Sequence, residues 1–146
     1  MDNEAKAQAK KARLNAAAKG RRLVQLAKAF LEARGCVVEV AANQIRWWKN
    51  PQGRMIPRSV HHDLFGVWDL LAVSQAERAF YQVTTLSEVS HRREKILAAG
   101  FPADPRDAIL AWVGGRGRHF RVLRGPDFTT ASAERWEPVK EATDAP

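Results

Sequence analysis

The sequence has 146 residues, of which 45% are hydrophobic, and a formal net charge of +8. A chain of this length has room for one compact domain with short tails, and its apolar share is enough to fill a single core. No stretch reaches the ~18 consecutive apolar residues of a membrane helix, and the first residues lack the apolar core of a signal peptide. We therefore expect a cytoplasmic protein that does not enter a membrane.

The excess of positive charge favours polyanionic partners, of which nucleic acid is the first candidate. The alternative is that the basic side chains only keep the chain soluble, or that they dock on an acidic protein or on ribosomal RNA. The first 22 residues are rich in alanine and contain a series of cations: Lys6, Lys10, Lys11, Arg13, Lys19, Arg21 and Arg22. Such a segment cannot bury itself, so residues 1–20 are expected to form a solvated helix or a basic arm.

The first predicted elements follow this arm. Apolar residues at helical spacing predict a helix over about 21–34, and Gly35 stands where such a helix would end. The β-branched run over 36–41 predicts a buried strand. Residues 45–58 contain the turn-like sequence Asn50-Pro51-Gln52-Gly53 between two strand-like runs, which predicts a β-hairpin flap.

The second half of the chain continues the alternation of strands and helices. Thr85 and Glu88 have the spacing of a capping box at the start of a helix. The expected elements are strands over 67–73 and 79–84, a helix over about 86–99, and strands over 108–113 and 119–123. This order predicts an α/β fold in which helices flank a mixed central sheet. Residues 21–125 would form the domain, and residues 126–146 a C-terminal tail.

Three polar residues interrupt the two apolar strands over 67–84. Asp69 is costly to bury unless it is paired or binds a metal ion. Gln82 and Thr84 project to the same face of their strand, because side chains alternate along a strand. If the two strands pair as a hairpin, the three side chains come together near one end of the sheet. The alternative is that Asp69 caps a strand while Gln82 and Thr84 hydrogen-bond each other.

These strands also resemble a known family. Gly66-Val67-Trp68-Asp69-Leu70-Leu71-Ala72 followed by Tyr81-Gln82-Val83-Thr84 is similar to the two-strand signature of the PD-(D/E)xK nucleases, most closely the archaeal-type and phage Holliday-junction resolvases. The resemblance covers about residues 20–124. It implies a restriction-endonuclease-like core with the element order αβββαβ. It also implies cleavage of DNA with Mg²⁺ or Mn²⁺, commonly by a homodimer.

The resemblance assigns the metal ion to Asp69, Gln82 and the carbonyl group of Val83. Two positions depart from the family pattern, because Gln82 stands at the acidic position and Thr84 at the lysine position. The leading helix also lacks the acidic residue found in the resolvases. The polar residues available to complete the centre are Asp63, Glu39, His61 and His62. We expect Asp63 to join the metal site and His62 to act as a general base, since histidine titrates near neutral pH; polar loop residues are the alternative.

Nucleic-acid contacts are expected from the leading helix, the flap and the second helix. The flap interleaves aromatic rings with cations, as stacking on unpaired bases and neutralising phosphates require. A tryptophan pair in the core or at a dimer interface is the alternative. Basic residues of the second helix are expected on its exposed face. The candidate contacts are Arg21, Arg22, Arg46, Trp47, Trp48, Lys49, Arg54, Arg58, Arg92 and Lys95.

The sequence thus predicts a metal-dependent endonuclease that acts on branched DNA, and the resemblance implies a homodimer. A catalytically inactive nucleic-acid-binding module of the same fold is the main alternative, and an RNA-binding protein is a third. Retention of Asp69 favours the enzyme, whereas the residues at positions 82 and 84 favour the binding module.

Overall fold

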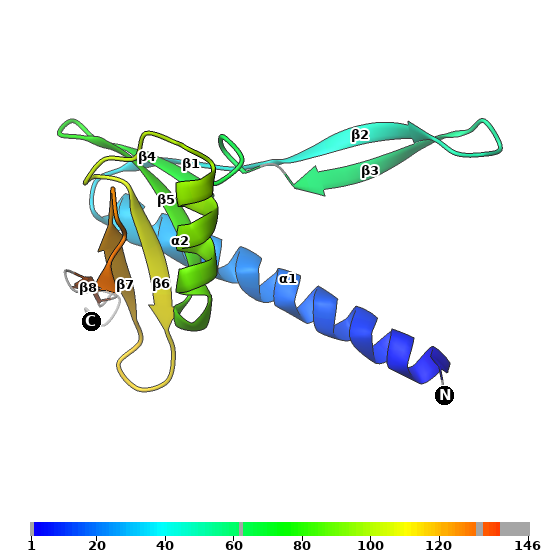
Figure 1. The fold of residues 1–146 in the computed structure, drawn as a ribbon, viewed down its shortest axis with the longest axis horizontal. Coiled ribbons are helices and arrows are strands. Elements are labelled where there is room, and N and C mark those ends of the chain that lie inside the picture. Colours follow the sequence, from blue (N-terminus) through cyan, green and yellow to red (C-terminus); the bar gives the residue numbers. More distant parts are fainter. Residues whose placement is uncertain (1, 62, 131–132, 138–146) are drawn as a thin grey trace, which may run out of the picture.

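The computed structural model describes residues 2–61, 63–130 and 133–137. Figure 1 shows a twisted sheet with a helix on each side, and two extended segments that project from it. In chain order the elements are α1 (Asp2–Ala33), β1 (Val37–Val40), β2 (Asn43–Lys49), β3 (Met55–His61), β4 (Leu70–Val73), β5 (Arg78–Thr85), the 3₁₀ turn η1 (Leu86–Glu88), α2 (Val89–Ala98), β6 (Ala108–Val113), β7 (His119–Arg124) and β8 (Glu134–Trp136).

The central sheet has six strands in the order β1-β4-β5-β6-β7-β8. β5 and β6 are parallel and the other neighbours are antiparallel, so the sheet is mixed. The second half of α1 buries Leu23, Ala27, Phe30 and Leu31 against one face. On the other face, α2 packs through Val89 and Ile96. The predicted α/β class, with helices flanking a mixed sheet, is confirmed.

Helix α1 is longer than the sequence pattern predicts. It runs for 32 residues, about 48 Å at 1.5 Å per residue, and continues through Gly20. Alanine, lysine and arginine are strong helix formers, which explains why the helix extends through a segment that buries nothing. Nearly all side chains before Leu23 are exposed, and Leu14 is 61% exposed. Of the two forms expected for residues 1–20, the structure has the solvated helix.

The start of α2 differs from the predicted capping box. Thr85 makes no side-chain cap hydrogen bond, and its Oγ1 instead lies 3.2 Å from Oγ of Ser87. Residues Leu86–Glu88 form a 3₁₀ turn, so α2 itself begins at Val89. The spacing of Thr85 and Glu88 is thus compatible with a tighter turn, in which the reciprocal bonds of a capping box are not made.

Part of the segment expected as a C-terminal tail belongs to the sheet. β8 pairs with β7, and Trp136 is buried against the face covered by α1. Phe128 is fully buried on the opposite face. Burial of two large aromatic side chains outweighs the polar and proline-containing sequence around them. An ion pair also ties β8 to β7, since Nε of Arg124 lies 3.2 Å from Oε1 of Glu134.

This ion pair gives the stability of the protein a predictable dependence on pH. The hydrogen bond from Arg124 lowers the pKa of Glu134 below its ordinary value. A carboxyl group with a lowered pKa in the folded state stabilises the protein above its unfolded-state pKa, and this contribution disappears as the pH falls through the folded-state pKa. Glu134→Gln should therefore lower stability at neutral pH by less than about 1 kcal/mol, because the pair is partly exposed. The difference between the urea midpoints of the two proteins should vanish in acid; a difference that persists there would contradict this role.

The predicted flap is confirmed as a β-hairpin. β2 and β3 form a two-stranded sheet of their own, and they pack mainly against each other. The connecting turn is closed at Asn50, whose amide and side chain both bond to Arg54 at 2.9 and 2.8 Å. Gly53 adopts φ +82°, a left-handed conformation that suits glycine. Figure 1 shows the hairpin and the first half of α1 extending from the same side of the sheet.

Within the residues described, none of the helices is both long and apolar enough to cross a membrane.

Candidate functional site

A cleft of about 660 Å³ opens at the end of the sheet where β4 begins, between α1 and α2. Side chains from both helices, from the segment before β4 and from β5 line it. Its polar and charged lining residues are Arg21, Gln25, Asp63, Asp69, Gln82, Arg92 and Lys95. Several residues that the sequence pattern assigns to metal binding and to DNA binding therefore share one cavity.

Asp69 is held rigidly at the start of β4. Its backbone N–H donates to the Tyr81 carbonyl at 3.0 Å, and its own carbonyl accepts from Ala41 at 2.8 Å. Its carboxylate accepts a hydrogen bond from the Val83 N–H at 2.8 Å through Oδ2. The side chain is only 8% exposed. This buried carboxylate is thus oriented by the backbone of β5 and lines the cleft.

Gln82 contributes an amide group beside Asp69. The antiparallel register pairs Leu70 with Tyr81, so Gln82 follows the residue opposite the start of β4, and Asp69 and Gln82 line the same cleft. Gln82 is 2% exposed, and its Oε1 has no hydrogen-bond partner within the part of the chain that the structure describes. Leaving a buried acceptor without a partner costs free energy, which is typical of a site that completes its bonding with a ligand.

Val83 adds a main-chain oxygen to the same place. The N–H and C=O of one strand residue point toward the same edge, so the Val83 carbonyl faces the side on which its N–H meets Asp69. Val83 is also among the residues that line the cleft. The Val83 carbonyl therefore lies on the side of β5 that borders Asp69.

Asp63 and Lys95 bring a close ion pair into the cleft. Nζ of Lys95 donates to Oδ2 of Asp63 at 3.0 Å, and Asp63 is the more buried partner. Arg92 lies one helical turn before Lys95, and its buried Nε has no partner among the described residues. The prediction that Arg92 and Lys95 occupy the exposed face of α2 is wrong, because both are partly buried at the border of the helix face that packs on the sheet.

The remaining predicted centre residues lie elsewhere. Thr84 is buried on the same face of β5 as Gln82, but it does not line the cleft. Glu39 is exposed on β1. His62 and the side chain of His61 lie outside the described part of the chain. Lys95 lines the cleft from α2, and sequence spacing gives no sign that Lys95 contacts Asp63.

The oxygen atoms of the residues that line the cleft suit a hard cation, although few of these residues are charged. Among the residues that the structure describes, no cluster of three or more histidine, cysteine, aspartate or glutamate side chains is placed to hold a metal ion. The side-chain oxygens that line the cleft come from two carboxylates, Asp63 and Asp69, and from two amides, Gln25 and Gln82. Mg²⁺ and Mn²⁺ prefer oxygen ligands, and Mg²⁺ commonly keeps several waters. The unpartnered Oε1 of Gln82 also fits a bound cation.

No protein-family model matches the chain, and no curated protein or solved structure matches it either. Its function must therefore be inferred from the chemistry of its own residues.

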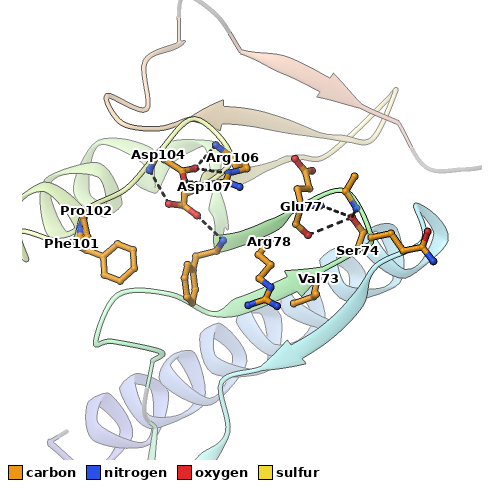
Figure 2. Close-up of a pocket in the computed structure, with 12 residues that line it drawn as sticks. Val73, Ser74, Glu77, Arg78, Phe101, Pro102, Asp104, Arg106 and Asp107 are labelled. Carbon is orange, nitrogen blue, oxygen red and sulfur yellow. Dashed lines mark hydrogen bonds and ion pairs between the residues drawn. The ribbon is translucent and has the colours of Figure 1, made fainter.

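A second depression, of about 540 Å³, lies between the β4–β5 turn and the loop before β6. Two of its charged residues, Asp104 and Arg106, pair with each other, as Figure 2 shows, with Oδ2 and Nη2 2.7 Å apart. Buried Asp107 accepts hydrogen bonds from the N–H groups of Phe80 and Asp104 at 2.9 and 3.0 Å. These contacts join the start of β5 to the loop before β6, so the polar groups serve the fold, and the cleft containing Asp69 is the better candidate site.

The other predicted nucleic-acid contacts lie on the two projecting segments. Arg21 and Arg22 are exposed on α1, and Arg21 also lines the cleft. The hairpin exposes Arg46, Trp47, Trp48, Lys49, Arg54 and Arg58. Trp47 and Trp48 therefore do not belong to the core of this chain. Basic side chains thus line the cleft from α1 and α2, and other basic side chains are exposed on the hairpin.

Proposed function

We propose that this protein is a divalent-metal-dependent endonuclease that acts on DNA, with its active centre in the cleft between α1 and α2. The observation that carries the proposal is the convergence of Asp69, the unpartnered Oε1 of Gln82 and the Asp63–Lys95 pair in one partly enclosed cavity. The order of helix, strands, helix and strand around this cavity also supports a restriction-endonuclease-like core.

Asp69, Gln82, the Val83 carbonyl and Asp63 would hold Mg²⁺ or Mn²⁺. When bound, such an ion stabilises negative charge on a phosphate and lowers the pKa of water. Asp69 contributes charge and a fixed position, because the Val83 N–H orients its carboxylate. Gln82 contributes an oxygen without charge. The ion would also satisfy the buried amide oxygen of Gln82, which has no other partner among the described residues.

Lys95 would provide the cation that the family pattern places on the strand. A positioned ammonium group stabilises the charge that develops on a phosphate during hydrolysis. Asp63 accepts a hydrogen bond from Lys95 at 3.0 Å, which restricts a long side chain that would otherwise be flexible. Lys95 would thus act on the substrate, and Asp63 would orient it and share in binding the metal ion.

DNA would reach the cleft along basic surfaces of α1 and the hairpin. Both segments project from the same side of the molecule, and their cations are exposed. Lysine and arginine side chains that neutralise phosphates release counterions, so affinity should fall steeply as the salt concentration rises. Binding of this type does not depend on sequence, which suits recognition of DNA by its shape.

Incubation of the purified protein with supercoiled, linear and four-way-junction DNA tests the proposal. We expect cleavage with Mg²⁺ or Mn²⁺ and none with a chelator, fastest on the branched DNA. Lys95→Met should slow cleavage by about 100-fold or more while the protein stays folded. Lys28, a partly exposed lysine of α1 whose Nζ lies 3.5 Å from Oε1 of Glu32, offers a matched control, since Lys28→Met should cut at the wild-type rate. Absence of cleavage under every condition would refute the enzymatic proposal.

A nucleic-acid-binding module without catalysis is the second candidate. Gln82 and Thr84 carry no charge, and the described residues contain no cluster of three metal-binding side chains. Under this interpretation the Asp63–Lys95 pair stabilises the cleft and the two projecting segments bind DNA. The same experiment separates the candidates, because the module would bind every DNA in a salt-dependent manner and cut none of them.

A further inference from the structure

The two faces of the β2–β3 hairpin each present a tryptophan to solvent. Trp47 and Trp48 are 61% and 51% exposed. They are neighbours on one strand, so their side chains project to opposite faces of the hairpin. A hairpin that only packed against the body of the protein, or against a single partner surface, would expose one apolar face. This hairpin exposes an aromatic ring on both.

The strand register places a cation beside each tryptophan. Trp48 shares its face with Arg46 and Arg58, which lie directly opposite each other. Trp47 shares the other face with Lys49. A ring with an adjacent cation can stack on a base while the cation contacts the neighbouring phosphate. Both faces therefore combine the two groups needed to bind an unpaired nucleotide.

The charge of the hairpin selects among possible partners. Residues 43–61 contain four basic and no acidic residues. A second copy of the hairpin would bring the same charge, so self-association through this surface is disfavoured. Binding of the hairpin to an anionic lipid surface is also disfavoured. The apolar side chains lie along the two faces of the hairpin, whereas its tip has the polar sequence Asn50-Pro51-Gln52-Gly53. A polyanion with stackable rings remains the best match.

The shape of the hairpin fits insertion between strands. Its turn is closed by three hydrogen bonds among Asn50, Gly53 and Arg54, so the tip is preformed. It extends away from the sheet, on the side where α1 also projects (Figure 1). An isolated two-stranded hairpin is marginally stable in water, and ordering it on DNA would add the contacts that it lacks within the chain.

We propose that the β2–β3 hairpin is a wedge that inserts where duplex DNA opens into unpaired strands, with one strand stacking on Trp47 and the other on Trp48. This inference rests on the DNA binding in the proposed function but is independent of cleavage. It defines the substrate class as forked or branched DNA, because a blunt duplex offers no unpaired bases on two sides. The hairpin thereby acts as a specificity element, separate from the cleft that contains Asp69.

Fluorescence anisotropy with a forked duplex and a blunt duplex of equal length tests the wedge, with chelator present so that nothing is cut. Trp47→Ala and Trp48→Ala should each weaken binding to the fork by about 5- to 150-fold, the loss expected for one stacked base. Binding to the blunt duplex should stay within about twofold. Trp47→Phe and Trp48→Phe keep a ring and should recover most of the affinity. Leu14→Ala removes an equally exposed apolar side chain from α1 and should leave binding to both DNAs unchanged.

Three results would overturn the wedge: unchanged affinity for the fork in both alanine variants, loss in only one of them, or equal loss on the blunt duplex. A wild-type dimer that dissociates in the alanine variants during sedimentation would indicate self-association instead. Binding to phosphatidylserine vesicles that depends on the tryptophans, without an effect on DNA, would indicate a membrane surface. Selective fork binding by a protein that cuts no DNA would leave the wedge standing and refute only the endonuclease.

Discussion

Asp69→Asn is expected to abolish metal-dependent cleavage while leaving the protein folded and able to bind DNA. The substitution removes the charge with which Asp69 would hold a divalent cation, and loss of a metal ligand should lower the cleavage rate by at least about 100-fold. An asparagine Oδ1 can still accept the hydrogen bond that Oδ2 of Asp69 takes from Val83. DNA binding should persist, because the exposed cations of α1 and the hairpin are unchanged.

Asp69→Ala provides the control for a structural role of this carboxylate. Alanine leaves the Val83 N–H without its acceptor inside a buried strand pair, at a cost of about 1–3 kcal/mol. We therefore expect the urea midpoint to fall for Asp69→Ala and to change little for Asp69→Asn. The opposite result would be an Asp69→Asn variant that is as unstable as the Asp69→Ala variant and still cuts DNA at the wild-type rate. In that case Asp69 only caps the strand, and the catalytic assignment fails.

Much of the fold could be predicted because its elements have strong local patterns. The two strands around residues 67–84 are apolar runs separated by a polar turn, and they pair as the sequence suggests. The flap follows from the turn sequence at residues 50–53. Elements that depend on distant partners could not be predicted. β8 is a three-residue strand in a polar segment, and it forms because Trp136 finds a buried position against Tyr81 and Phe120.

In the candidate site too, contacts between segments far apart in the sequence could not be predicted. Asp69 and Gln82, which the sequence pattern places near one end of the sheet, line one cleft. Thr84 stands at the position where the family pattern has a lysine, yet Thr84 does not line the cleft. Lys95 of α2 lines the cleft instead. The contact of Lys95 with Asp63 spans 32 residues of sequence, and it exists only because α2, which packs on β5 and β6, meets the segment before β4. No local periodicity encodes such a contact, so a sequence pattern can place strand residues in a site more readily than helix residues.

The second large effect is expected at Trp68, the residue before Asp69. Trp68 is fully buried, and its ring lies 5.9, 5.6 and 6.1 Å from the rings of Phe80, Phe101 and Phe128. Trp68→Ala would leave a cavity among these rings and should cost about 3–5 kcal/mol. Since folded domains are stable by only about 5–15 kcal/mol, this is a large share of the total. Thermal unfolding should show a Tm lowered by roughly 10–20 °C.

Trp68→Phe separates the packing of the ring from its polar group. The Nε1 of Trp68 is buried without a hydrogen-bond partner in the described part of the chain, so a phenylalanine loses volume but also removes an unsatisfied donor. We expect a cost of about 1–2 kcal/mol. The backbone of Trp68 exchanges hydrogen bonds with Leu64 at 2.7 and 3.0 Å, and this bridge should survive in Trp68→Phe and keep Asp69 in place. Trp68→Phe should therefore retain metal-dependent cleavage well below its Tm. A loss of cleavage equal to that of Asp69→Asn would mean that the indole itself, and not only the position of the strand, is needed at the cleft.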